Sequence, residues 1–290
     1  PFDPPEEYLA RYDADALPPP LFRESDMERQ KAFRNIRCQM VDAVNPLRDP
    51  TEAEEEAYED FSTRGSRPPK AFNGRKIKAA YYAMITLLDE QFGRLLAGLE
   101  AAGELENTLV LFTSDHGEFL GDHGLLYKGG RFFEGLVRVP LIAWWPGQTV
   151  SGVRAPCMAE SVDLAPTLLE AAGLPVPYFM QGRSLLPILT GQADPAAHKA
   201  VAITDFYDSV GSSPAQVPTQ ATMTCDGHYK LVVYHHVGLG ELFDLEADPG
   251  EFDNLWDSPA HATLKTELMA RHLDAVIGTV SPGTHRVSTA

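Results

Sequence analysis

The sequence predicts an α/β fold: a mixed, largely parallel sheet sandwiched by helices, then a smaller C-terminal antiparallel sheet with one helix. A helical pattern over residues 74–103 is followed by the apolar run T-L-V-L-F-T at residues 108–113. Short β-type runs then fill the last third of the chain. Because short β-type runs separated by turn residues begin near residue 195, we predict a domain of residues 1–195 and a subdomain of residues 196–290.

The first predicted elements come from proline and from helical periodicity. Residues 1–25 are rich in proline, so we expect an extended surface segment. Asp49 and Pro50 suit the cap and first position of a helix, and the acidic run after them suits the positive end of its dipole. The strongest helix, residues 74–103, has an apolar face that recurs every three or four residues. That face comprises Ile77, Tyr81, Met84, Leu88, Phe92, Leu95 and Leu99.

The later elements are predicted from apolar runs and turn residues. Residues 108–113 show little alternation, which favours a strand buried on both faces in a parallel sheet. Residues 137–145 can form a second strand, and residues 161–172 a helix closed by glycine. The predicted C-terminal strands are residues 200–204, 221–225 and 229–234, before a closing helix over residues 260–277.

Composition excludes several classes of partner. The net charge is −17, which repels nucleic acid and anionic membrane surfaces. An anionic substrate would therefore need a local positive centre, such as a metal ion or a lysine. No apolar run approaches the length of a membrane span. The three cysteines, Cys38, Cys157 and Cys225, are too few and scattered for a disulfide framework or a zinc module.

A charged, glycine-rich stretch follows the predicted strand, where open α/β sheets bind ligands. Residues 113–130 read T-S-D-H-G-E-F-L-G-D-H-G-L-L-Y-K-G-G. Asp115 and His116 are a credible pair of metal ligands, although such a pair can also be a hydrogen-bonded structural couple. Lys128 could bind a sulfate or phosphate group beside the metal, or it could be a surface lysine. Their joint occurrence in one glycine-rich loop favours a site.

Three other polar residues of this stretch stay open to two interpretations. Asp122 and His123 could support the site from behind its ligands or could stabilise the loop. Glu118 is most simply a residue at a helix start or in solvent. A plain zinc hydrolase is not favoured, because the chain has no H-E-x-x-H motif.

Several segments resemble the sulfatases, of the alkaline phosphatase superfamily. The likeness begins with T-S-D-H-G-E-F-L-G-D-H-G and Y-K-G-G-R-F-F-E-G-L-V-R-V-P-L-I-A-W-W-P-G. It continues, in the family's order, through S-V-D-L-A-P-T-L-L-E-A-A-G-L, G-R-S-L-L-P-I-L-T-G and E-L-F-D-L-E-A-D-P-G-E-F-D-N-L. The segments span nearly the whole chain, which is far more specific than one short pattern.

The resemblance implies an alkaline-phosphatase-like fold and hydrolysis of a small sulfated substrate. Asp115 and His116 would bind a divalent metal, with Ca²⁺ expected. Because His116 stands where many arylsulfatases carry Asn, Mn²⁺ is the alternative. Lys128 would contact the sulfate oxygens and act in catalysis, and His123 is the second catalytic candidate. The expected nucleophile is a formylglycine made from the first residue of a C-x-P/A-S-R motif.

The chain departs from the family pattern at the nucleophile. Its cysteines stand in the contexts R-C-Q-M, P-C-M-A and T-C-D-G. The family's first acidic metal ligands also have no counterpart here. The chain starts without Met, like the interior of a longer protein. We therefore expect the carboxyl-terminal part of a sulfatase, with its formylglycine upstream and little turnover by itself.

The sequence leaves alternative functions, the subcellular location and the oligomeric state open. One alternative is a phosphonate monoester or phosphodiester hydrolase of the same superfamily, and another is a non-catalytic, degenerate relative. The start lacks a signal peptide, so both a cytoplasmic and a periplasmic location stay open. A homo-oligomer is possible, since a partial domain would expose sheet surface.

Overall fold

The computed structural model describes residues 2–40, 42–54, 69–208 and 218–280. These residues form two compact units, which are described separately. One unit comprises Pro1–Leu105 and His116–Val139, and the other comprises Glu106–Asp115 and Pro140–Ala290. The boundary predicted at residue 195 stays a prediction.

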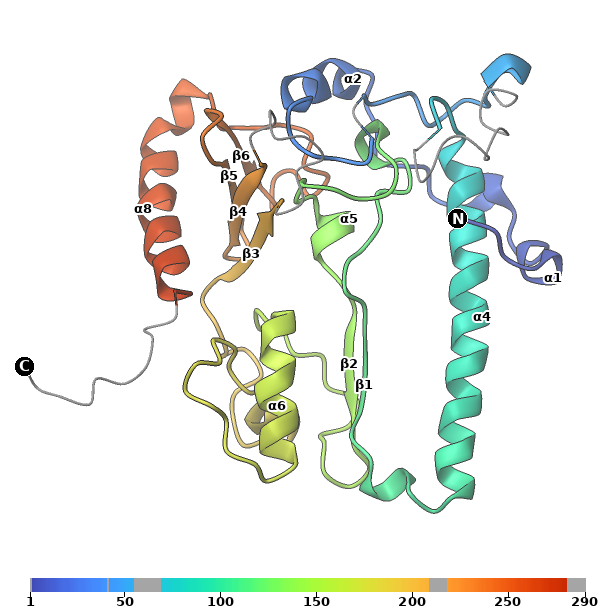
Figure 1. Cartoon of the computed structure of the whole chain (residues 1–290), viewed down its shortest axis with the longest axis vertical. Helices are drawn as coiled ribbons and strands as arrows, with labels where there is room; N and C mark the ends of the chain where they lie inside the picture. The colour runs from blue at the N-terminus through green and yellow to red at the C-terminus, as the bar shows by residue number, and fades with distance from the viewer. Residues whose placement is uncertain (1, 41, 55–68, 209–217, 281–290) are drawn as a thin grey trace, which may run out of the picture. The chain divides into compact units, whose positions relative to one another are not determined.

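The first unit is built around the long helix α4, Gly74–Ala101 (Figure 1). The side chain of Asn73 caps it by accepting hydrogen bonds from the amides of Arg75 and Lys76. Gly103, in the left-handed region at φ 72°, follows its end, so the predicted helix is confirmed to within two residues. Its predicted apolar face is only partly covered, because Leu88 and Leu95 are 62% and 67% exposed.

Short helical turns make up the rest of the first unit. The proline-rich start is not wholly extended, because it contains helix α1 (Glu6–Leu9) and turn η1 (Ala14–Ala16), which both contact α4. The remaining elements are α2 (Ser25–Arg29), η2 (Gln30–Phe33), η4 (Asp122–Gly124) and α5 (Glu134–Val137). The helix expected after Asp49 is described only at residues 52–54, and the rest of that expectation lies outside the described residues.

The second unit contains a two-stranded sheet that corrects the predicted parallel pairing. Strand β1 (Val110–Thr113) pairs antiparallel with β2 (Leu141–Trp144), and the described residues contain no parallel pair. A run of apolar residues predicts burial of a strand but carries no information on the direction of its partner. Burial is also incomplete, since Phe112 and Ile142 lie opposite each other and are 38% and 60% exposed.

Along the chain, between the strands of its two sheets, this unit forms η5 (Ser161–Asp163), α6 (Leu164–Ala171) and α7 (Leu186–Leu189). The first two confirm the helix predicted over residues 161–172. The turn η3 (Leu105–Asn107) joins α4 to the segment that carries β1.

The C-terminal antiparallel sheet is confirmed. It has the order β3 (Ala202–Tyr207), β4 (Gln220–Cys225), β5 (Tyr229–Tyr234) and β6 (Leu239–Asp244). Strand β6 was not predicted. Turn η6 (Pro259–His261) leads into α8 (Ala262–Gly278), which contacts β4 and β5 and covers one face of the sheet (Figure 1).

An apolar core holds α8 on this sheet, and a buried ion pair holds the turn after β6 there. Leu231, Leu242 and Leu268 form the core. Lys230 Nζ lies 2.7 Å from Glu251 Oε1, and both side chains are almost fully buried. Replacing one partner would leave a buried charge, so this pair fixes the turn against the sheet.

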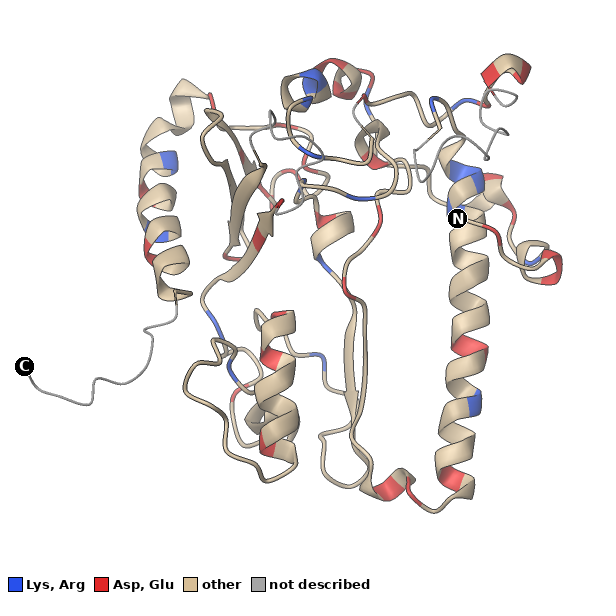
Figure 2. Cartoon of the chain, in the orientation of Figure 1, with Lys and Arg blue, Asp and Glu red and all other residues tan. Residues whose placement is uncertain are grey.

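Charge is spread rather than clustered. Figure 2 marks acidic residues on α1, α4, α6 and α8. Among the described residues, no helix combines the length and apolarity that a membrane crossing requires.

Candidate active site

Hydrogen bonds and close backbone contacts shape the loop after β1. In the first unit, the amide of Gly117 donates to the carbonyl of Leu136 at 2.7 Å, and that of Phe119 to the carbonyl of Tyr127 at 3.1 Å. A Cβ atom at Gly117 would lie 2.0 Å from the carbonyl oxygen of Gly135. Glycine is therefore required at position 117 by a close approach of two backbones.

The loop brings His116 and Lys128, two of the predicted site residues, into contact. Lys128 Nζ lies 2.6 Å from His116 Nε2, and His116 Nδ1 lies 2.7 Å from the carbonyl oxygen of Gly117. A carbonyl only accepts, so Nδ1 carries the imidazole proton and Nε2 accepts from the lysine. The imidazole lone pair on Nε2 thus already faces a cation.

Asp115, the other predicted metal ligand, belongs to the second unit. It is exposed, and its Oδ1 accepts from the hydroxyl of Ser114 at 3.5 Å. Within the part of the chain that the structure describes, no three His, Cys, Asp or Glu residues come together to hold a metal ion. The carboxylate of Asp115 and the unprotonated Nε2 of His116 are suitable donors, but their joint use stays a prediction.

The burial of Glu118 was not predicted from the sequence. Glu118 is half-buried, and its Oε1 is a buried atom without a hydrogen bond among the described residues. Burial raises the pKa of the Glu118 carboxyl, and the nearby charges of His116 and Lys128 oppose that change.

His123 is enclosed by the loop and by α2. Its ring stacks on Phe133 with centroids 3.9 Å apart, and its Nδ1 lies 2.9 Å from an Arg29 nitrogen and 3.8 Å from Asp26. Burial lowers the pKa of His123, which favours the neutral ring. Such contacts suit a residue that stabilises the loop, and a catalytic role for His123 stays a prediction.

Asp122 connects the loop to two other parts of the first unit. Its Oδ1 accepts from the amide of Leu21 at 2.8 Å and lies 3.4 Å from Lys78 Nζ on α4. These contacts support the loop-stabilising interpretation of Asp122.

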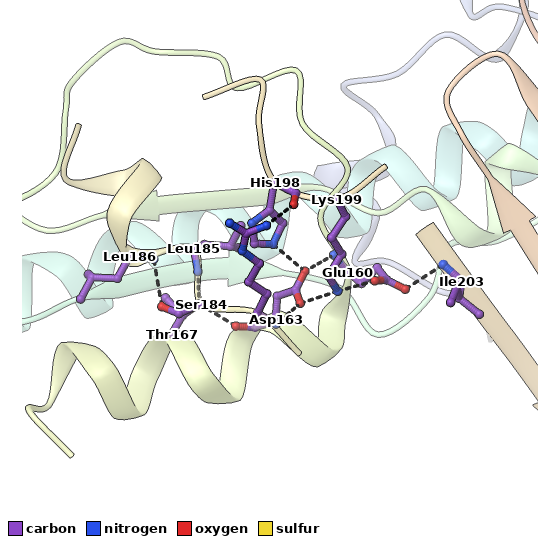
Figure 3. A network of polar contacts seen from close by, with 10 residues as sticks. Glu160, Asp163, Thr167, Ser184, Leu185, Leu186, His198, Lys199 and Ile203 are labelled. Atoms are coloured by element: carbon purple, nitrogen blue, oxygen red, sulfur yellow. Dashed lines mark hydrogen bonds and ion pairs between the residues drawn. The ribbon is translucent and has the colours of Figure 1, made fainter. Parts of the chain in front are cut away.

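A second polar cluster lies in the second unit, around the fully buried Asp163 (Figure 3). Lys199 Nζ and His198 Nε2 lie 2.6 and 3.1 Å from its carboxylate. The amides of Arg183 and Glu160 donate to the same carboxylate at 2.7 and 2.9 Å. Burial acts to raise the pKa of Asp163, but Lys199 and the two amides outweigh it and lower the pKa. Four donors satisfy the carboxylate, so the cluster ties η5 to the segment before β3.

Comparison with protein families decides the family of the chain. The sulfatase family model matches residues 30–174. The model of the C-terminal part of N-sulphoglucosamine sulphohydrolase matches residues 121–277. The chain belongs to the sulfatase family. Its resemblance in sequence is thereby confirmed, including the place of the chain in the alkaline phosphatase superfamily.

Known relatives support the same assignment over part of their length. An N-acetylglucosamine-6-O-sulfatase of Bacteroides thetaiotaomicron is 37% identical over 195 residues, covering 65% of this chain and 34% of the relative. A multifunctional alkaline phosphatase superfamily protein of Trinickia caryophylli is 40% identical, covering 66% of this chain and 38% of the relative. The matched two thirds of this chain therefore span little more than a third of either relative.

The solved structures support an alkaline-phosphatase-like fold. A phosphonate monoester hydrolase of Agrobacterium radiobacter superposes with a TM-score of 0.75 at 26% identity. The match covers 97% of this chain and 55% of that enzyme. Nearly all of this sulfatase-family chain thus corresponds to about half of a larger catalytic fold.

Proposed function

We propose that the sulfatase-family protein containing this chain hydrolyses sulfate esters with the help of a divalent metal ion. The observation that carries the proposal is the contact between Lys128 Nζ and His116 Nε2 at 2.6 Å. It brings an exposed ammonium group next to the unprotonated imidazole nitrogen of His116, which is a donor of the kind that metal ions accept. The positive ammonium group can attract a sulfate group, which the net negative charge of the protein would otherwise repel.

Each residue has a distinct role in the proposal. Lys128 binds sulfate oxygens and stabilises the negative charge that develops on them. Asp115 and His116 hold the metal, and further ligands come from residues outside this chain. When bound, the cation acts as a Lewis acid on a sulfate oxygen. Ca²⁺ is the expected ion, and the imidazole donor of His116 keeps Mn²⁺ as an alternative.

The nucleophile is proposed to lie outside these residues. None of the three cysteines stands in a C-x-P/A-S-R motif, where a formylglycine would form. These residues alone should therefore turn over little or no sulfate ester. The test compares the purified 290-residue chain with the polypeptide isolated from its source, using an aryl sulfate. Sulfatase activity of the chain alone, free of longer contaminants, would contradict this part of the proposal.

A phosphonate monoester hydrolase is the second candidate function. Its support is the phosphonate monoester hydrolase fold, which matches 97% of this chain. The sulfatase function ranks first, because the sulfatase family model matches the loop that carries Lys128. Rates of the source protein on an aryl sulfate and an aryl phosphonate ester would decide between them. A higher kcat/KM on the phosphonate would replace the first proposal by the second.

A further inference from the structure

Lys128 is held by a segment of chain that precedes it by about ninety residues. The side-chain oxygen Oε1 of Gln39 accepts from the amide of Lys128 at 3.2 Å, across 89 positions of sequence. The amide of Gln39 donates to the carbonyl of Lys128 at 3.0 Å. Gln39 therefore binds both backbone groups of Lys128.

The neighbouring residues extend this contact. Cys38 and Gly129 form an isolated antiparallel bridge, and the amide of Gly130 donates to the carbonyl of Arg37 at 2.7 Å. A Cβ atom at Gly129 would lie 2.4 Å from the Cα of Cys38. The two backbones therefore touch, and only glycine fits between them.

The upstream segment is itself fixed in the first unit. Ile36 and Met40, which flank residues 37–39, are 5% and 4% exposed. With both flanks buried, the segment can act as a rigid support for the loop. No motif in the sequence predicts a role for this segment.

The support acts at a strained point of the loop. Tyr127 has a φ of 66°, in the left-handed region that a bulky residue rarely adopts. The amide that Gln39 accepts from belongs to the peptide that joins Tyr127 to Lys128. A hydrogen bond at this peptide opposes its rotation, and rotation would redirect the whole lysine side chain.

We propose that Gln39 is a positioning residue, which fixes the backbone of Lys128 so that its ammonium group stays at His116 and meets the substrate anion. This proposal rests on the proposed function for its effect on catalysis. Gln39 itself is exposed and touches Lys128 only through the backbone. Its effect on an anion is therefore indirect.

The test uses two substitutions of Gln39 and one control. Gln39→Met keeps the length of the side chain but removes the accepting oxygen, whereas Gln39→Glu keeps an oxygen at that position. Gln91→Met is the control, since Gln91 lies on α4 and accepts from Arg94 at 2.6 Å. All variants should unfold at the same temperature as the wild type to within about 2 °C, because Gln39 is exposed and Gln91 is only half-buried.

The first readout is the rate at which acetic anhydride modifies Lys128, measured by mass spectrometry relative to Lys76. In Gln39→Met the ammonium group leaves His116 more often, so Lys128 should react about threefold faster than in the wild type. Gln39→Glu and Gln91→Met should match the wild type. An unchanged rate in Gln39→Met overturns the proposal, whether or not the protein is a sulfatase.

The second readout is kcat/KM on a sulfate ester, measured in the source protein. Gln39→Met should lower kcat/KM about tenfold, because a small displacement of the Lys128 ammonium group weakens its interaction with the transition state. If Lys128 reacts faster but kcat/KM is unchanged, the contact is only structural and the proposal is wrong. If the wild type hydrolyses no sulfate ester, the proposed function fails, and the acetylation rates still decide whether Gln39 positions Lys128.

Discussion

The ammonium nitrogen of Lys128 lies 2.6 Å from Nε2 of His116. The proton on Nδ1 is held by the carbonyl of Gly117, at 2.7 Å. The lysine thus occupies the lone pair through which His116 would bind a metal ion.

A divalent cation and Lys128 should compete for His116. Lys128→Met removes the competing charge, so the source protein should bind Mn²⁺ about threefold or more tightly, as measured by the signal of free Mn²⁺ in electron paramagnetic resonance. Lys76→Met is the matched control, since Lys76 pairs with Asp49 and is 66% exposed. Weaker binding by Lys128→Met would show that the lysine does not compete. His116→Ala should weaken binding in both backgrounds.

Activity should depend on Lys128 far more than stability does. Lys128→Ala should lower kcat/KM on an aryl sulfate by about 10²-fold, because it removes the charge that stabilises the sulfate oxygens. The side chain is exposed, so the thermal midpoint should change little. Lys76→Ala is again the control. A loss of activity no larger than that of the control would contradict the role given to Lys128.

Asp163 should stabilise the second unit. Asp163→Asn removes the charge that Lys199 and His198 face, and we expect a loss of about 3 kcal/mol in the free energy of unfolding, measured with urea. The exposed Asp194→Asn, which loses no ion pair with any residue that the structure describes, serves as the control.

The same carboxylate predicts a dependence on pH. Its pKa is lowered in the folded state, so the stabilisation is present above the unfolded value of 3.8 and is lost as pH falls through the folded pKa. Asp163→Asn should abolish this part of the acid response. An equal acid response in both proteins would exclude Asp163 as its source.

His272 should make stability depend on pH in a higher range. Burial lowers its pKa to about 4, and its nitrogens bond the hydroxyls of Thr222 and Thr224 at 2.8 and 3.0 Å. Between the unfolded value of 6.5 and about 4, the unfolded chain binds more protons than the folded chain. Stability should therefore be full above pH 6.5 and fall as the pH is lowered toward 4.

The measurement for His272 is the urea midpoint from pH 7 to 4, compared between the wild type and His272→Gln. The variant keeps polar atoms for the threonines but does not titrate, so its profile should lose the slope in this range. His261→Gln controls for removal of a histidine, since His261 lies in η6 and its ring contacts the hydroxyl of the nearby Ser258 at 2.9 Å. Parallel profiles of wild type and His272→Gln would refute the prediction.

Local patterns accounted for the elements that depend on neighbours in sequence. The helix Gly74–Ala101 was predicted because its apolar spacing and the following Gly103 are local signals. Strand β6 was missed, since its Glu241 breaks the apolar run. That glutamate is buried because Tyr234, on the neighbouring strand, donates to it at 2.8 Å. No pattern within one strand reveals a partner on the next.

The sequence by itself determined the family, the main helices and strands, and the loop that contains His116 and Lys128. Each of these features depends on a short segment of sequence, so it can be predicted from local patterns and their order along the chain. Tertiary structure decided the antiparallel pairing of β1 with β2, the burial of Glu118 and the hold of Gln39 on Lys128. Each of these depends on which distant backbone comes within hydrogen-bonding or packing distance, and that is a property of the folded chain as a whole.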